Sequence, residues 1–178
     1  MPSLVHPQPS TESAPAPVPL TLRFALSHPA HLLALGGGTG LSPWAPGTVG
    51  TALAVPIHAL LLQAVSVPTA WCLVFVFFVA GVWACARTGR DLGVADHGGM
   101  NWDETVAFLG VLVFTGDSWL WGAIGFGLFR FFDIVKPPPV GAADRHVKGG
   151  LGVMLDDALA ALCTVLVLRA LQVSGWFA

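Results

Sequence analysis

Acidic side chains carry most of the chemistry that this sequence could perform. Five of them stand beside apolar stretches, as the pairs Asp103-Glu104 and Asp156-Asp157 and as Asp133. A carboxylate next to an apolar core is costly unless a cation or a hydrogen-bond donor compensates it. Simple capping of helix starts, where the helix dipole favours acids, explains each pair separately. Convergence of all five instead predicts an oxygen-rich site suited to Mg²⁺.

Neighbouring polar residues narrow the kind of ion that such a site would hold. Asp96 lies in the same linker as Asp103 and is a further candidate ligand. Zinc would require histidine or cysteine, and the nearby histidines, His97 and His146, are single loop residues that more often face solvent. Lys136 stands three residues after Asp133 on one helical face, so an ion pair between them is the structural alternative. The donor set therefore favours a hard cation.

A glycine-rich loop over residues 36–51 could supply a partner for that cation. It is built from Gly, Ser, Thr and Pro and directly precedes an apolar run. Its backbone N–H groups, its hydroxyls and the helix N-terminus at its end suit a phosphate dianion. The loop lacks the Gly-Lys-Ser/Thr ending of a P-loop, and a flexible loop with no ligand is the alternative.

Known phosphatase schemes other than metal-assisted hydrolysis do not fit the residues. A cysteine phosphatase needs an arginine six residues after its nucleophile, but Asp91 stands six residues after Cys85. The Asp-x-Asp and Ser-Gly-His patterns of two other phosphatase classes are absent from the chain. Hydrolysis assisted by a bound metal is the scheme that remains.

Composition places these residues in a membrane protein. The chain has 178 residues, is 54% hydrophobic and 10% charged, and has a mean hydropathy of +0.73. A formal charge of −2 excludes a basic surface for nucleic acid. Three cysteines in apolar runs do not form a disulfide framework. A soluble helical protein with a very apolar core is the alternative.

The apolar runs predict the helices that must position the acids. Residues 51–67 and 70–86 are 17-residue runs, near the lower limit for crossing a bilayer. The runs 105–116 and 119–129 are each too short to cross alone, so they form either one interrupted span or a hairpin. Residues 158–178 form a last span or an interfacial helix.

The basic residues distinguish between these arrangements. Apart from Arg23 and Arg169, they fall in two linkers, around residues 87–90 and 130–148. Positive charge in short loops marks the cytoplasmic face, so both linkers should face inward. Only a hairpin over 105–129 returns the chain to that face. The clusters of acids are then expected on one side of the membrane.

The first 22 residues are predicted to form a separate, disordered tail. Six prolines among residues 1–20 prevent a regular element from propagating. The first basic residue is Arg23, so a cleaved secretory leader is not supported. We therefore expect one folded domain over residues 23–178.

Four sequence blocks, residues 38–51, 96–104, 129–137 and 148–157, together resemble the phosphatidylglycerophosphatase A family. They occur in the family's order over about residues 36 to 165. The resemblance implies an all-α helical fold, and the run lengths and charge placement predict a helical membrane bundle with short spans and an active site on the cytoplasmic side. The resemblance also implies a Mg²⁺-dependent enzyme of the cell inner membrane that converts phosphatidylglycerophosphate to phosphatidylglycerol and phosphate.

Under this hypothesis each group of residues receives a role. The expected catalytic residues are Asp103, Glu104, Asp133, Lys136, Asp156 and Asp157. The expected metal ligands are Asp96, Asp103, Glu104, Asp133, Asp156 and Asp157. The expected contacts to the substrate phosphate are Thr39, Ser42, Gly47, Thr48, Thr51 and Arg130. Attack by a metal-activated water and a covalent aspartyl-phosphate both stay open.

Other functions also stay open. Another lipid phosphate, such as phosphatidic acid, is the nearest enzymatic alternative. A non-catalytic membrane subunit would not need the acids or the glycine loop, and a small transporter would carry more polar residues inside its spans. The expected partners are the lipid substrate and the bilayer, and a homo-oligomer is compatible with the sequence.

Overall fold

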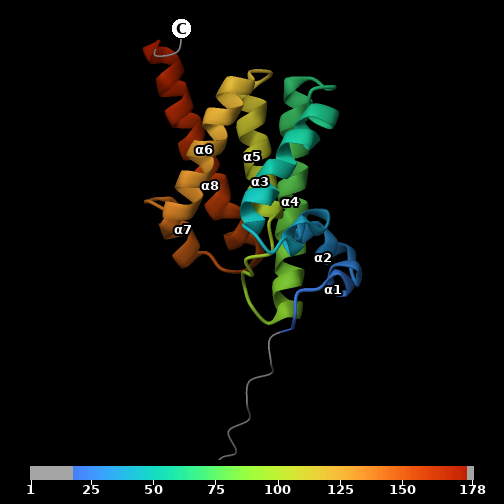
Figure 1. Ribbon diagram of the computed structural model, residues 1–178. Coiled ribbons are helices and arrows are strands. Elements are labelled where there is room, and N and C mark those ends of the chain that lie inside the picture. Colours follow the sequence, from blue (N-terminus) through green and yellow to red (C-terminus); the bar gives the residue numbers. More distant parts are fainter. Residues whose placement is uncertain (1–17, 176–178) are drawn as a thin grey trace, which may run out of the picture.

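A computed structural model describes residues 18–175 of the chain (Figure 1). Every regular element in that range is helical, which confirms the all-α part of the expected fold class. The expected disorder of the Pro-rich tail lies, up to residue 17, outside the described residues. The elements are α1 (Leu22–Leu26), α2 (Pro29–Ala34), the 3₁₀ segment η1 (Gly36–Leu41), α3 (Pro46–Ile57), the π-helical segment η2 (His58–Leu62), α4 (Val67–Leu92), α5 (Trp102–Thr115), α6 (Trp119–Val135), α7 (Val140–His146) and α8 (Gly149–Ser174).

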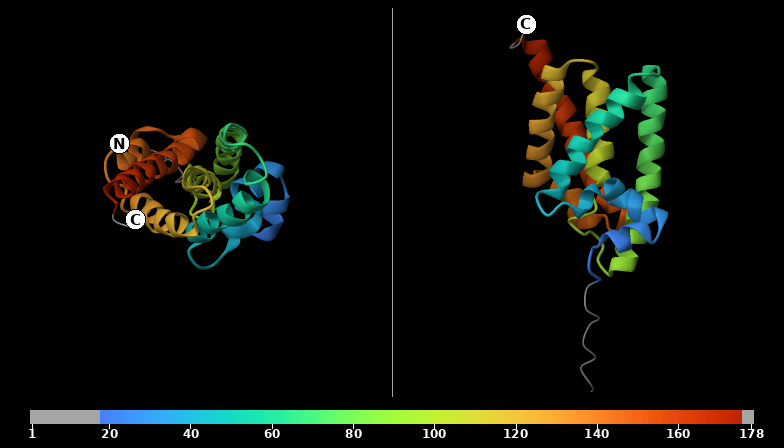
Figure 2. Two further views of the ribbon diagram at one scale, coloured as in Figure 1. Left: turned by 90° about the horizontal axis from the view of Figure 1, so that it is seen from above. Right: turned by 45° about the vertical axis from the view of Figure 1, so that its right-hand side comes forward.

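Helix α5 lies at the centre of the molecule. It contacts α3, α4, α6 and α8, and the view from above in Figure 2 shows it between them. Its residues from Trp102 to Leu112 are buried, with the exception of Glu104, which is half-buried. Phe108 packs against Phe129 of α6 inside the largest apolar core. The acids at the start of α5 are therefore held inside the protein.

The two longest helices, α4 and α8, pack closely against each other at a glycine. A Cβ atom on Gly150 would meet the α4 backbone at the carbonyl oxygen of Val82 and the nitrogen of Ala86. Only a residue without a side chain permits this approach of two backbones. The contact fixes the position of the first turns of α8. Asp156 and Asp157 lie on the same helix, about two turns after Gly150.

Both α4 and α8 are long and apolar enough to cross a membrane, and no other described helix passes that test. On α4, the side chains of Phe75 and Val79 are 67% and 52% exposed. A helix in the core of a soluble protein would bury such residues, whereas lipid would cover them. The exposed apolar surface thus favours membrane association over the soluble alternative.

The short apolar runs form a hairpin, as the distribution of positive charge predicts. Helix α5 ends at Thr115, residues 116–118 turn, and α6 returns along α5. Figure 1 shows that the start of α5 and the end of α6 lie at the same end of the molecule. The two linkers that carry most of the positive charge consequently lie at that end.

Two helix boundaries differ from the sequence expectation. The run 51–67 is divided between α3, η2 and a turn, and Pro56 lies just before the π-helical segment. Proline lacks the N–H that an α-helix needs at this position, so the helical hydrogen bonding changes there. Helix α8 begins at Gly149 instead of residue 158. Hydropathy alone places Asp156 and Asp157 in a linker, but the helix includes both residues and buries their side chains.

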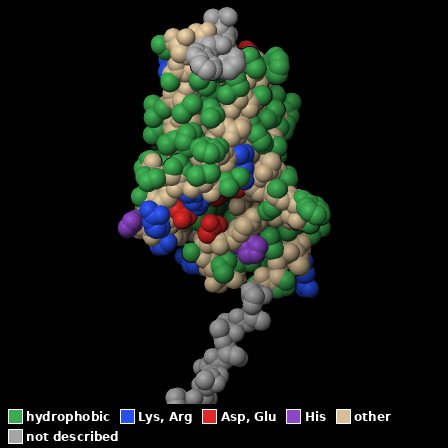
Figure 3. Space-filling view, turned by 60° about the vertical axis from the view of Figure 1, so that its left-hand side comes forward, with side chains coloured by type: hydrophobic (Ala, Val, Ile, Leu, Met, Phe, Trp, Pro, Cys, Tyr) green, Lys and Arg blue, Asp and Glu red, His purple; other side chains and the backbone are tan. Residues whose placement is uncertain are grey.

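Charged side chains gather at one end of the molecule. In Figure 3 the upper part of the surface is largely hydrophobic, and acidic and basic side chains surround a hollow in the lower part. The start of α5, the end of α6, α7 and the start of α8 meet at this lower end (Figure 1). This arrangement agrees with the expectation that the acid clusters share one side.

Candidate active site

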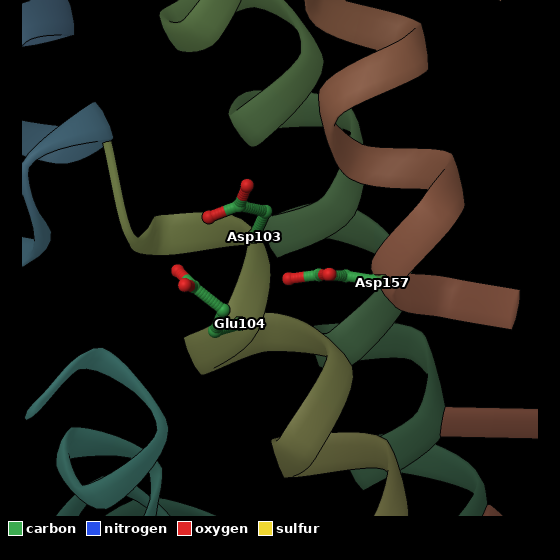
Figure 4. Close-up of side chains that lie close together, drawn as sticks. All are labelled: Asp103, Glu104 and Asp157. Carbon is green, nitrogen blue, oxygen red and sulfur yellow. The ribbon is translucent and has the colours of Figure 1, made fainter. Parts of the chain in front are cut away.

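Three carboxylates from two helices meet at the centre of the charged end. Asp103 and Glu104 come from the first turn of α5, and Asp157 comes from α8. One oxygen of each lies within 4.8 Å of an oxygen of the other two. Figure 4 shows the three side chains converging on a common space. We call them the carboxylate triad.

The start of α5 is held in place by the polar residues around the acidic pair. Asn101 is fully buried, and its Nδ2 donates to the carbonyl oxygen of Pro46 at 2.9 Å and to Thr39 Oγ1 at 3.0 Å. Thr105 Oγ1 donates to the carbonyl oxygen of Gly50 at 2.8 Å. These bonds fix the first turn of α5 against the glycine-rich loop and α3. Sequence reasoning did not single out either residue, although both flank the acidic pair.

The carboxylate triad has buried oxygens that nothing in the described protein satisfies. Asp103 Oδ1, Glu104 Oε2 and Asp157 Oδ2 are inaccessible and have no hydrogen-bond partner. Buried charges are tolerated when they are paired or coordinate a metal. Three carboxylate oxygens with no histidine or cysteine among them form a donor set for a hard cation such as Mg²⁺. The residues therefore fit the ion that the sequence implied.

Arg130 of α6 lies beside the carboxylate triad. Its Nη1 is 2.6 Å from Asp133 Oδ2, 3.6 Å from Glu104 Oε1 and 3.4 Å from Thr51 Oγ1. Its Nε is buried and makes no hydrogen bond. The side chains of Arg130, Glu104 and Asp133 are 13 to 16% exposed, so they are accessible at the margin of the site. A guanidinium in this position suits a phosphate group.

The first turn of α3 faces the same space. A Cβ atom on Gly47 would collide with Glu104 Oε1 and stand 3.2 Å from both Nη atoms of Arg130. Thr48 follows Gly47 in this turn, and one turn later Thr51 Oγ1 donates to the carbonyl oxygen of Gly47 at 2.9 Å. Backbone N–H groups at a helix start attract anions. The structure thus brings Gly47, Thr51 and Arg130 next to Glu104 of the carboxylate triad. The predicted contact of Thr48 with the substrate phosphate stays a prediction.

The other two loop hydroxyls are used within the chain. Thr39 Oγ1 donates to the carbonyl oxygen of Gly36 at 3.0 Å and accepts from Asn101. Ser42 Oγ donates to the carbonyl oxygen of Trp44 at 2.8 Å. These hydroxyls shape the loop that precedes α3. Their predicted contact with a substrate phosphate stays a prediction.

Two of the remaining predicted acids, Asp96 and Asp156, belong to a second group around Lys136. Its Nζ lies 2.6 Å from Asp144 Oδ1 of α7 and 2.6 Å from Asp156 Oδ2 of α8. A small cavity of about 120 Å³ beside this group is lined by Asp96, Asp144 and Asp156. We call these four residues the lysine cluster. The predicted six-residue ligand set is therefore divided: Asp96 and Asp156 lie in the lysine cluster, and Asp133 is paired with Arg130.

Charges within the lysine cluster are balanced by direct contact. Burial lowers the pKa of Lys136, but its hydrogen bonds to Asp144 and Asp156 outweigh burial and raise the pKa above its usual value. The same hydrogen bond from Lys136 lowers the pKa of Asp144. Lys136 is also one of two non-glycine residues with a left-handed backbone in the described chain, with φ 47°. Strain of this kind concentrates at functional sites and switch regions.

The two loop histidines make local contacts. His97 Nδ1 accepts from the backbone N–H of Gly99, and His146 Nδ1 is 2.8 Å from the carbonyl oxygen of Ala142. Neither histidine belongs to the carboxylate triad.

Comparison with known proteins identifies relatives over nearly the whole domain. The family model described as phosphatidylglycerophosphatase A matches residues 32–172. A phosphatidylglycerophosphatase A of Haemophilus influenzae is 40% identical over 151 residues, which are 84% of this chain and 93% of the relative. The phosphatidylglycerophosphatase A of Escherichia coli is 40% identical over 143 residues, 78% of this chain and 80% of the relative.

A third relative carries a different name. A Bacteroides thetaiotaomicron protein, provisionally named a phosphatidylinositol-3-phosphatase, is 40% identical over 136 residues, 72% of this chain and 84% of the relative. No solved structure matches the chain significantly. All three relatives are thus named for removing a phosphate from a phospholipid headgroup.

Proposed function

The chain belongs to the phosphatidylglycerophosphatase A family, and we propose that its carboxylate triad holds the metal ion used in the reaction. The protein is a phosphatase that hydrolyses phosphatidylglycerophosphate to phosphatidylglycerol and phosphate. The observation that supports the metal site is the set of three buried carboxylate oxygens without a partner.

Asp103, Glu104 and Asp157 are the proposed ligands of Mg²⁺, with Asp133 close enough to Asp157 for their charges to interact. When bound, Mg²⁺ would neutralise charge on the phosphate and make a coordinated water a better nucleophile. The protein contributes by fixing the ligands before the ion arrives. Asn101 and Thr105 hold the two α5 ligands at the helix start.

Arg130 is the proposed binding group for the phosphate oxygens. Its salt bridge with Asp133 keeps the guanidinium directed along α6 toward the first turn of α3. Cations placed on the non-reacting oxygens stabilise the charge of a phosphoryl transition state. The N-terminus of α3, at Gly47 and Thr48, would contact the same phosphate through its backbone N–H groups.

Lys136 has a different proposed role from that of Arg130. It forms ion pairs with two carboxylates of the lysine cluster, Asp144 and Asp156, and Asp156 stands directly before the triad residue Asp157. Lys136 therefore fixes the first turns of α8 against α7. We propose that Lys136 positions Asp157 by holding its neighbour Asp156. Asp96, which lines the same cavity as Asp144 and Asp156, would add to the negative electrostatic potential around Lys136.

We further propose that the protein is a multi-pass helical bundle in the inner membrane, with its charged end in the cytoplasm. The charged end carries Arg87, Arg145 and Lys148, and positive residues are retained on the cytoplasmic side. A phosphate monoester on a lipid headgroup lies at the interface, where this end would meet it. Labelling of a single cysteine placed at Lys148 by a membrane-impermeant reagent, applied from each side of vesicles, tests the orientation.

The decisive experiment measures phosphate release from phosphatidylglycerophosphate by detergent-purified protein, with Mg²⁺ and with EDTA. We expect release that requires Mg²⁺ and is lost in Asp103→Asn. The control variant Asp91→Asn removes an acid that is paired with Arg87 and His31 outside the site, and it should remain active. Equal rates in EDTA, or full activity of Asp103→Asn, would contradict the metal site.

The same assay distinguishes the substrate alternatives. Phosphatidic acid and a phosphoinositide monophosphate, offered at the same surface concentration, should be hydrolysed more slowly than phosphatidylglycerophosphate. A folded protein that releases phosphate from none of the three would instead indicate a non-catalytic membrane subunit.

A further inference from the structure

A cavity of about 380 Å³ opens between α3, η2, α5 and α6, on the membrane side of the active site. Helices α3 and α6 flank α5 on this face, as the front of Figure 1 shows. The wall is mostly apolar, and its side chains include Val55, Ala59, Phe108, Leu112, Ala123 and Phe126. Its size falls within the range of about 300–1,000 Å³ that is typical of ligand pockets. We call this cavity the α3–α6 groove.

The groove lies beyond the active site along one face of α5. Glu104 belongs to the carboxylate triad, and Phe108 and Leu112 line the groove. Residues four apart lie above one another on a helix, so these three side chains form one row. At a rise of about 1.5 Å per residue, the row is about 12 Å long.

The two flanking helices repeat this pattern. On α6, Arg130 lies at the active site, and Phe126 and Gly122, at four-residue intervals, line the groove. On α3, Thr51 contacts Arg130, and Val55, four residues later, lines the groove. All three helices thus place a polar residue at the charged end and apolar or small residues directly above it.

Polar residues line the far end of the groove. Gln63 Nε2 donates to Asp117 Oδ1 at 3.0 Å, which joins the end of η2 to the turn between α5 and α6. Both residues and the buried side chain of His58 line the cavity. The apolar part of the groove is therefore limited in length by this polar bridge.

We propose that the α3–α6 groove binds one acyl chain of the phospholipid substrate while its phosphate monoester lies at Arg130 and the carboxylate triad. This inference rests on the proposed function and adds the part of the substrate that the site recognises besides the headgroup. A phospholipid joins an anionic group to a hydrocarbon chain. The groove joins a cationic and metal-binding end to a hydrocarbon wall in the same order.

Two glycines of α6 provide a matched test. A Cβ atom on Gly122 would stand 3.5 Å from Leu112 Cδ2, which is ordinary contact, so a leucine there would extend into the groove. A Cβ atom on Gly127 would have no neighbour within 4 Å, and Gly127 does not line the groove. Gly122→Leu and Gly127→Leu change helix propensity equally. They differ in whether the new side chain occupies the proposed acyl site.

The experiment compares long-chain phosphatidylglycerophosphate in mixed micelles with its deacylated, water-soluble headgroup. We expect Gly122→Leu to lower kcat/KM for the long-chain substrate by about tenfold, mainly through KM, and to leave hydrolysis of the headgroup unchanged. Gly127→Leu should match the unmodified protein with both substrates. Ala59→Leu, on the opposite wall, should act like Gly122→Leu and serves if that variant does not fold.

Each other outcome overturns the proposal. Equal losses with both substrates would show that Gly122→Leu disturbs the site, and unchanged rates with both would show that no acyl chain uses the groove. If the unmodified protein releases phosphate from neither substrate, the proposed function itself fails. If the unmodified protein hydrolyses both substrates but the groove variants do not lose activity selectively with the long-chain substrate, the proposed function is supported and the acyl-chain site is refuted.

Discussion

Asp156 and Asp157 are adjacent on α8 but lie in different electrostatic surroundings. Asp156 Oδ2 is 2.6 Å from the ammonium group of Lys136, which also contacts Asp144. Asp157 is turned toward Asp103 and Glu104 (Figure 4), and its Oδ2 is buried without a partner. In the lysine cluster the chain supplies its own cation. In the carboxylate triad, three acids share one space and Arg130, next to Glu104, is the basic side chain in contact with them.

Burial of an acid therefore does not by itself reveal its role. Both aspartates are at most 6% exposed, so accessibility does not separate them. What separates them is whether a donor of the chain satisfies their oxygens. An acid with a permanent cation is a structural element, whereas a set of acids without one is suited to bind an ion from solution.

The strongest test of this comparison replaces each aspartate in turn. We expect Asp157→Asn to lower kcat by on the order of 10²–10³-fold, since it removes a charge placed to hold the metal at the reacting phosphate. Asp156→Asn should lower kcat much less, because the asparagine oxygen can still accept the hydrogen bond from Lys136 that positions this turn of α8. The measurement is phosphate release at saturating substrate and Mg²⁺. Equal losses in the two variants would remove the distinction between the clusters.

Replacement of Arg130 tests the cation that adjoins the carboxylate triad. Arg130→Gln should reduce kcat/KM by about 10²-fold, because one cation on the phosphate oxygens is lost. Arg130→Lys keeps the charge but not the planar fork, so it should recover only part of the activity. Full activity of Arg130→Gln would mean that Arg130 serves only to pair with Asp133.

Thermal unfolding with and without Mg²⁺ distinguishes the two clusters without any assay of activity. Mg²⁺ at about 100 times its Kd should raise the free energy of unfolding by about 2.7 kcal/mol, because it binds only the folded protein. The shift in Tm should persist in Asp156→Asn and vanish in Asp157→Asn. In EDTA, Asp157→Asn should melt above the unmodified protein, since three buried carboxyl groups no longer crowd one space without a cation. A lower Tm in EDTA would show that the triad is already compensated.

The smallest expected effect concerns Asp144, the more exposed partner of Lys136. Its pKa is lowered in the folded protein, so its ion pair stabilises the fold above the unfolded pKa of about 3.9 and is lost as the pH falls through the folded pKa. At pH 7, Asp144→Asn should cost less than about 1 kcal/mol, because the side chain is 41% exposed. The Tm difference from the unmodified protein should shrink as the pH falls through the lowered pKa of the folded Asp144. A difference that persists there would reflect packing and not charge.

The sequence predicts much of the fold and the identity of the acids, but not how they are divided. The hairpin of α5 and α6 follows from loop charges, and the pairs 103–104 and 156–157 are visible beside apolar runs. Adjacent residues on a helix point about 100° apart, so Asp156 and Asp157 can face different neighbours, although the adjacent Asp103 and Glu104 meet in one cluster. Which neighbours these are depends on the packing of α5, α7 and α8, which no local pattern encodes.

The loop residues illustrate the same limit. Thr39 and Thr51 are equivalent in the sequence as hydroxyls of one glycine-rich segment. In the structure Thr39 is bonded to Asn101, whereas Thr51 lies one helical turn after Gly47 and contacts Arg130. Hydropathy also misplaced the start of α8, because buried acids inside a helix resemble a polar linker until their partners are known.

The close approach of α8 to α4 at Gly150 has a thermodynamic consequence for ion binding. A backbone held against another backbone has little freedom to slide or rotate, and Asp157 stands two helical turns further along the same rigid element. Asp103 and Glu104 are fixed in turn by the buried bonds of Asn101 and Thr105. The entropy of ordering the three carboxylates is therefore lost when the protein folds, so an incoming cation meets donors already in place and its affinity is not reduced by that ordering.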